Sequence, residues 1–145
     1  MPDYWSVWEG IPSIDTTETH SGSHAIRLGN GQSGWEGISA EAVNVEQGKT
    51  YCFGAWVKTN TENQQFWFNT NGAQLQSVTL TAGEWTYVST EYTANSTASL
   101  ILQVDAYISG DSVVYIDDVE FYPLEETEEN TSVMWVYLPV SYGYT

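Results

Sequence analysis

The sequence predicts an all-β protein, built as a two-sheet antiparallel β-sandwich of the jelly-roll type. Three observations support this fold class. No segment of about a dozen residues carries apolar positions at helical spacing, runs of period two recur, and clusters of Gly, Asn, Ser and Thr separate these runs. In chain order, strands are expected at residues 4–8, 25–28, 36–45, 50–59, 65–69, 74–80, 86–93, 99–108, 113–122 and 133–140.

Two of these strands show the alternation most clearly. In the strands expected at 50–59 and 99–108, every second residue is apolar, whereas most of the residues between them are polar or mixed. Because successive side chains of a strand point to opposite faces, one face of each strand should enter the core. The expected core residues are Tyr51, Phe53, Ala55 and Val57 in the first strand, and Leu100, Leu102, Val104 and Ala106 in the second.

The charge balance excludes several classes of partner. The 145 residues include three basic and 19 acidic side chains, giving a net charge of −16. Such a chain repels phosphate backbones and anionic lipid surfaces, so we expect no nucleic-acid and no membrane partner. Solubility accounts for this acidity without any cation site. The lone cysteine, Cys52, allows no intramolecular disulfide and is expected to be a small core residue.

Composition divides the chain into three parts. Residues 1–124 are long enough for one domain with a core of its own. Residues 125–131 form an acidic, turn-rich segment, which we interpret as a solvated linker. Residues 132–145 form an aromatic, β-prone segment without charge, which should not remain exposed to water.

Four short segments follow one another in a recognisable order. They read His-Ser-Gly-Ser-His-Ala-Ile-Arg-Leu at 20–28, Gly-Lys-Thr-Tyr-Cys-Phe-Gly-Ala-Trp-Val-Lys at 48–58, Gly-Glu-Trp-Thr-Tyr-Val at 83–88 and Val-Tyr-Ile-Asp-Asp-Val at 114–119. This order resembles the carbohydrate-binding modules of families 4, 9 and 22, over roughly residues 8–124. The resemblance implies a non-catalytic β-sandwich that binds polysaccharide.

The resemblance also implies a structural calcium ion. In the family, an Asp at the position of Asp117, with backbone carbonyls near Ser23, commonly holds this ion. The shell needs six to eight oxygens, one of which often comes from an opening strand that reads Asn-Gly-x-Phe-Glu. The sequence opens on Met-Pro-Asp without that strand. The alternative, in which Asp117 and Asp118 are turn and cap carboxylates, therefore stays open.

The family's opening strand lies near its last strand. Its absence should leave unpaired backbone groups beside residues 113–122, and the C-terminal segment has the right length and chemistry to cover them. We therefore expect this segment to complete a sandwich, either its own or that of a neighbouring molecule by strand addition. The residues expected to make this assembly contact are Val133, Trp135 and Tyr137.

A glycan site needs exposed aromatic rings beside amide, carboxylate or guanidinium groups. Trp35 follows a glycine-rich turn and resembles the cleft tryptophan of the family. Gln103, Asp105 and Tyr107 share the face of a strand whose other face is apolar, and the family places polar sugar contacts on the matching strand. Trp56 with Lys58, and Gln65 with Trp67 and Asn69, form two further sets that could line the same sheet, although burial in the core is the alternative for both tryptophans. The candidate carbohydrate-binding residues are Trp35, Gln103, Asp105, Tyr107, Trp67 and Arg27, the last of which could instead pair with a carboxylate.

Catalysis finds little support in the sequence. The adjacent carboxylates Asp117 and Asp118 face opposite sides of a strand, and His20 and His24 lack a third metal ligand nearby. Two functions remain. One is a glycan binder for adhesion, displayed on a larger extracellular assembly for attachment to polysaccharide or cell-surface glycan. The other is a structural subunit without sugar binding, such as a virion decoration or fibre protein or an extracellular filament protein, which associates with itself or with capsid or filament neighbours. Both place the protein outside the cell or on a virion surface, although residues 1–8 do not read as a secretory signal.

Overall fold

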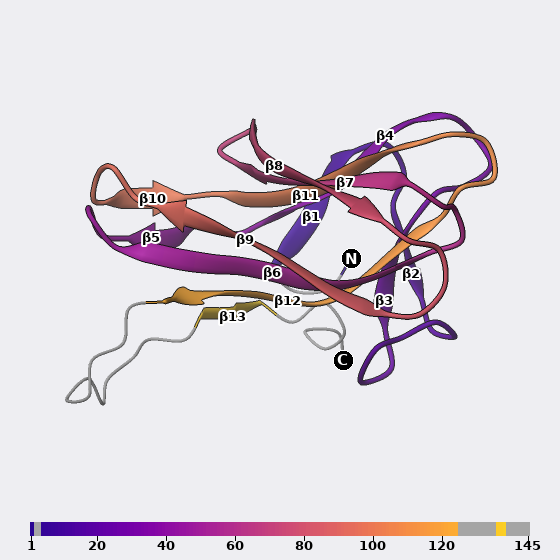
Figure 1. Cartoon of the computed structure of the whole chain (residues 1–145), viewed down its shortest axis with the longest axis horizontal. Helices are drawn as coiled ribbons and strands as arrows, with labels where there is room; N and C mark the ends of the chain where they lie inside the picture. Colours follow the sequence, from indigo (N-terminus) through magenta and orange to yellow (C-terminus); the bar gives the residue numbers. More distant parts are fainter. Residues whose placement is uncertain (2–3, 125–135, 139–145) are drawn as a thin grey trace.

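The computed structural model describes residue 1, residues 4–124 and the backbone of residues 136–138, and it confirms the predicted two-sheet antiparallel sandwich. Figure 1 shows the two sheets stacked as layers, one with the order β1-β4-β11-β7-β8 and one with the order β2-β3-β12-β6-β9. The strands are β1 (Trp5–Glu9), β2 (Ser13–Asp15), β3 (Ala25–Leu28), β4 (Gly34–Ala40), β5 (Val43–Val45), β6 (Thr50–Thr59), β7 (Gln64–Thr70), β8 (Ala73–Leu80), β9 (Thr86–Thr93), β10 (Ala98–Leu100), β11 (Leu102–Ile108), β12 (Val114–Pro123) and β13 (Val136–Leu138). No helix in the described part of the chain is long and apolar enough to span a membrane.

The core lies between the two sheets and is built from the alternating faces that the sequence predicts. All eight expected residues of β6, β10 and β11 are buried. At its centre, Phe53 of β6 packs edge-on against Phe68 of β7 at 4.7 Å between ring centroids and against Phe121 of β12 at 5.9 Å. Contacts of this kind across the layers fix which face of each strand points outward.

Three of the expected details differ from the structure. Two expected strands are each divided, the first into β4 and β5 and the second into β10 and β11, because β5 and β10 leave the large sheets and pair with each other. The short β2, which was not among the expected strands, pairs with β3. Cys52 is buried, but its thiol lies on the outward face of β6, 3.7 Å from the hydroxyl of Tyr87, and not between the sheets.

The backbone of β13 pairs antiparallel with β12. Val119–Phe121 lie opposite this strand, and Tyr137 is in register with Glu120. Along one edge β12 pairs with β6, so β3 and β13 share the other edge, β3 at Val114–Ile116 and β13 further along. Val133 and Trp135 lie outside the described residues.

A buried carboxylate holds the β2–β3 loop against β12 at a β-bulge. Asp117 accepts hydrogen bonds from the backbone N–H groups of His20 at 2.9 Å, Ser21 at 3.1 Å and Asp118 at 2.8 Å. Asp118 adopts a positive φ of 48°, and the register with β6 shifts between Asp117 and Glu120. The side chain of Asp117 therefore fixes both the loop and the bulge.

Replacing Asp117 with Ala should lower the free energy of unfolding by about 3 kcal/mol, because it leaves buried backbone donors without an acceptor. Urea denaturation followed by tryptophan fluorescence measures this loss. Asp111→Ala is the matched control, since this exposed carboxylate precedes the same strand and its removal should cost less than about 0.5 kcal/mol. Equal stability of the two variants would contradict the structural role of Asp117.

Candidate functional site

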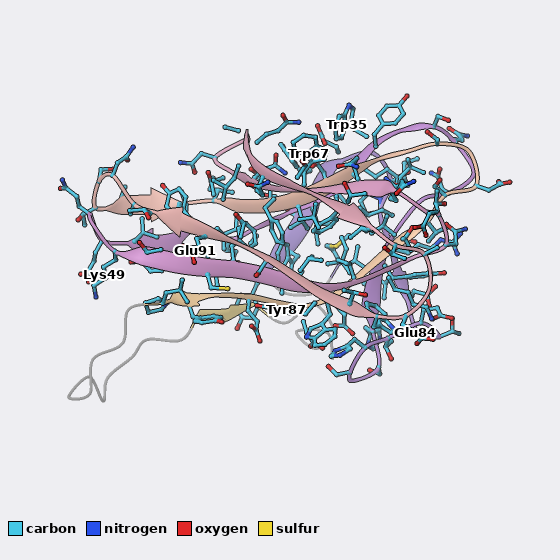
Figure 2. The ribbon with its side chains drawn as sticks, in the orientation of Figure 1. Trp35, Lys49, Trp67, Glu84, Tyr87 and Glu91 are labelled. Carbon is cyan, nitrogen blue, oxygen red and sulfur yellow. The ribbon has the colours of Figure 1, made fainter. Side chains whose placement is uncertain are left out.

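The outward face of the β1-β4-β11-β7-β8 sheet gathers most of the predicted sugar-binding residues. The pairing of β4 with β11 sets Trp35 opposite Tyr107 and Gly37 opposite Asp105. Trp35 is 38% exposed and Tyr107 46% exposed, and their rings meet edge-on with centroids 5.5 Å apart. Figure 2 shows Trp35 and Trp67 on the outer side of this sheet, away from the core.

A cleft of about 330 Å³ opens beside Trp35. Carboxyl and amide side chains from four different strands reach it, so it combines an aromatic wall with polar groups. Gly37 lets β11 and the Asp105 side chain pack closely against β4, because a methyl group at this position would lie 2.5 Å from the Asp105 side chain and 2.8 Å from the Val104 carbonyl. The lining residues are Trp8, Glu9, Trp35, Asn69, Gly72, Gln74 and Asp105.

Two buried amide groups fix the floor of the cleft. Asn69 donates a hydrogen bond to Asp105 Oδ1 at 3.0 Å and is 1% exposed. Gln103, 6% exposed, accepts a hydrogen bond from the Gly72 backbone N–H at 2.7 Å, which ties the β7–β8 turn to β11. Gln103 therefore positions the turn that borders the cleft.

The floor also contains a pair of carboxyl groups. Asp105 is 4% exposed, and Glu9 Oε1 is buried and receives no hydrogen bond from a donor in the described residues. The two carboxyl groups share a hydrogen bond when one of them is protonated. Burial and this contact with Glu9 raise the pKa of Asp105 to about 7, although the Asn69 hydrogen bond opposes the shift. Near neutral pH the pair therefore retains one proton for part of the time.

The same contact argues against glycoside hydrolysis by this pair. Hydrolases that use two carboxyl groups place them about 5 to 10 Å apart, with the sugar between them. Glu9 and Asp105 lie within hydrogen-bond reach of each other, so the scissile bond has no room between them.

Arg27, and the predicted set of Trp56 and Lys58, lie outside the cleft. Arg27 sits on β3, in register with Tyr115 of β12, and its Nε donates to the Gly29 carbonyl at 3.0 Å, so it lies on the other sheet and outside the cleft beside Trp35. Trp56 and Lys58 belong to β6 and face outward from the other sheet. Neither Trp56 nor Trp67 is a core residue, since both are half-buried on outer faces.

Sequence reasoning missed four residues that line the cleft: Trp8, Glu9, Gly72 and Gln74. Trp8 and Glu9 reach it because β1 pairs with β4 and its register shifts between Val7 and Glu9. Trp8 stood at the end of an expected strand, and that aromatic side chain was the one available signal. The bulge and the long-range pairing leave no trace in the local pattern.

The contacts of Asp117 favour the alternative without calcium. Both of its oxygens accept hydrogen bonds from backbone N–H donors. Ser23, near which backbone carbonyls were expected to bind the ion, has its hydroxyl 2.7 Å from His24 Nδ1. Burial, the largest influence, raises the pKa of Asp117. Within the described residues, no cluster of three or more His, Cys, Asp or Glu side chains is arranged to hold a metal. Of the two readings of Asp117, the turn carboxylate agrees with these contacts.

The pH dependence of folding tests the carboxyl pair. Because the pKa of Asp105 is raised in the folded protein from its ordinary value of 3.8 to about 7, the native state holds more protons than the unfolded chain between these values. Its contribution to stability is full below about pH 4 and is lost as the pH rises through 7, by roughly 4 kcal/mol.

Asp105→Asn keeps the Asn69 hydrogen bond and removes the titrating group, so the variant should be more stable than the unmodified protein at pH 8 and should gain nothing at pH 4. Glu9→Gln should act in the same way, because it supplies a permanent donor to the pair. Urea denaturation between pH 4 and 8 measures both. An unaltered pH slope in both variants would contradict the shared proton.

Residues 2–108 match the family model of CBM_4_9, described as a carbohydrate binding domain. Endo-1,4-β-xylanase A of Thermotoga maritima is 26% identical over 124 residues, which cover 75% of this chain and 12% of the xylanase. The chain thus spans a small part of the length of this curated relative.

Solved structures show the same fold. The C-terminal family 22 carbohydrate-binding module of Clostridium thermocellum xylanase 10B superimposes with a TM-score of 0.65 at 17% identity, covering 88% of this chain and 89% of that one. The N-terminal CBM22-1 and GH10 modules of the same organism's endo-1,4-β-D-xylanase 10B, complexed with xylohexaose, match with a TM-score of 0.64 at 19% identity, covering 86% and 26%. The family match extends over more than half of the sequence, and so the chain belongs to the CBM_4_9 family and carries a non-catalytic carbohydrate-binding module.

Proposed function

We propose that the cleft beside Trp35 binds a polysaccharide chain, with Trp35 and Tyr107 as the aromatic platform. The observation that carries this proposal is the pair of exposed, edge-to-face rings beside a polar cleft. Sugar rings present apolar C–H faces that stack on aromatic side chains, and their hydroxyl rims need donors and acceptors nearby. Trp67, half-buried in register with Asp105, extends the same face.

The polar groups of the cleft favour a neutral glycan. The Glu9 and Asp105 carboxyl groups line it, together with Asn69 and Gln74, and no Lys or Arg does. Hydroxyl groups can donate to these oxygens, whereas the carboxylates of an acidic polysaccharide would be repelled. Xylan is the first ligand to test, because curated relatives are xylanases and one solved relative holds xylohexaose.

The second part of the proposal is a role in attachment outside the cell. A single open cleft of this size gives modest affinity, and several copies on one assembly raise it by avidity. We therefore propose that the module attaches its owner to an extracellular polysaccharide. A structural subunit is the second candidate, favoured by the pairing of β13 with the edge of β12, since an edge strand of this kind is also a means of joining neighbouring molecules.

Replacing Trp35 with Ala should weaken xylohexaose binding tenfold or more, because it removes the larger ring of the platform. Isothermal titration calorimetry measures the dissociation constant. Leu124→Ala, which removes an exposed apolar side chain at the end of β12, is the control and should bind like the unmodified protein. If Trp35→Ala binds with unchanged affinity, the cleft is not the binding site.

A chain ending at Glu129 tests the second candidate. Removing β13 leaves part of the β12 edge unpaired, and we expect a loss of about 2 kcal/mol in the free energy of unfolding. Light scattering then separates the two roles. A full-length oligomer that becomes a monomer on truncation and binds no xylan supports the structural subunit, whereas a monomer in both forms with intact binding contradicts it.

A further inference from the structure

The outward face of the second sheet carries its own row of aromatic side chains. Ring centroids lie 5.6 Å apart between Tyr87 and Trp56, 3.9 Å between Trp56 and His20, 5.8 Å between His20 and Trp85, and 6.5 Å between Trp85 and Tyr115. These residues come from β9, β6, the β2–β3 loop, the β8–β9 turn and β12, so distant parts of the sequence converge on this face. In Figure 2, Tyr87 and Glu84 lie on the side of the molecule opposite Trp35.

One half of this aromatic row stabilises the fold. His20 stacks on Trp56 at an interplanar angle of 14°, and its Nδ1 lies 2.8 Å from Asp118 Oδ2. The Tyr87 ring covers Gly54, where a methyl group would come within 2.1 Å of its hydroxyl. These contacts pack the β2–β3 loop and β9 onto the sheet, and they leave Trp85 and Tyr115 as the outer end of the row.

A hollow of about 470 Å³ adjoins that outer end. Tyr115 forms one wall, and Lys58, its register partner on β6, lies in the lining with Glu18. Lys58 Nζ donates to Glu18 Oε1 at 2.8 Å, and both side chains are partly exposed, at 30% and 40%. Asn60 also lines the hollow and is held in place by two hydrogen bonds. Its side-chain N–H donates to the Asp111 carbonyl, and its side-chain oxygen accepts from the Val113 N–H.

The charges in this hollow select against ionic ligands. The Glu18 hydrogen bond, the largest influence, and the nearby Glu84 raise the pKa of Lys58, which keeps it charged. The Lys58 ammonium would repel a basic partner. The Glu18 and Glu84 carboxylates, on a chain of net charge −16, would repel an acidic one. A neutral ligand rich in hydroxyl groups fits both members of the ion pair, since an ammonium has three donors and the Glu18 contact uses one.

We propose that Tyr115, Trp85 and the Lys58–Glu18 pair form a second binding site for a neutral sugar, on the face opposite the cleft. Tyr115 supplies the stacking platform, Lys58 a donor and Glu18 an acceptor. Trp85 lies beside the hollow, with its ring centroid 6.5 Å from that of Tyr115. The choice of ligand class rests on the proposed function. One module with a site on each sheet can bridge two polysaccharide chains, which a single cleft cannot do.

The indole N–H signals of the tryptophans test this site in the full-length protein. A two-dimensional ¹H–¹⁵N titration with xylohexaose follows Trp35 and Trp85 separately, once each signal is assigned by replacement with Phe. We expect both signals to move, with two different dissociation constants. In Trp35→Ala, the Trp85 signal should still move, because the two sites lie on different sheets.

Tyr115→Ala should weaken the binding reported by Trp85 tenfold or more and leave the titration of Trp35 unchanged, which also shows that the variant is folded. Tyr115→Phe retains the ring and should bind like the unmodified protein, while Lys58→Met should weaken the second site alone. A static Trp85 signal beside a moving Trp35 signal overturns the second site only. A static Trp35 signal overturns the proposed cleft, and a Trp85 signal that responds to tetra-arginine and not to xylohexaose overturns the choice of ligand.

Discussion

The register between β4 and β11 is the constraint on which the cleft depends. Because strand side chains alternate, the pairing of Trp35 with Tyr107 and of Gly37 with Asp105 turns all of these residues outward and leaves Ile38 and Val104 in the core. A slip of one residue would bury a tryptophan and a carboxyl group and would expose the apolar side chains. The buried face of the sheet therefore sets the position of the binding face, and the energy that stabilises the core also preorganises the site.

The carboxyl pair lowers the stability of the folded protein when both of its groups are ionised. Asp105 and Glu9 lie together in the floor of the cleft, where two negative charges would repel each other strongly. One shared proton and the Asn69 amide offset this repulsion. As a result, the hydrogen-bonding capacity of the cleft floor changes with pH: a protonated pair offers a donor, and an ionised pair offers acceptors alone. Under the proposed function, binding of a hydroxyl-rich ligand is linked to the protonation of the floor.

The alternation of apolar residues was enough to predict the fold class, the core face of β6 and the outward set Gln103, Asp105 and Tyr107. It could not show that β1 joins β4, because that pairing depends on contacts across the whole sheet, and for this reason Glu9 was missed. For the same reason the sequence could not show that Arg27 lies on the other sheet, because polarity shows that a residue faces outward but not from which layer. The resemblance to a family gave Trp35 as the leading candidate, which the structure places beside a polar cleft, and suggested a calcium role for Asp117, whose three N–H contacts agree with a turn carboxylate.

The two outer faces of the sandwich differ in how their aromatic side chains are packed. On the cleft side, glycine and small polar groups lie between the rings and open a depression beside Trp35. On the other side, the rings of Tyr87, Trp56 and His20 pack closely enough to cover the sheet, and the hollow appears only where the row ends at Tyr115. An aromatic residue on an outer face is thus part of the fold where its ring is covered by a neighbour, and it is available to a ligand where a polar hollow adjoins it. By this criterion, Trp35 and Tyr115 are the residues that we propose contact a ligand on their respective sheets.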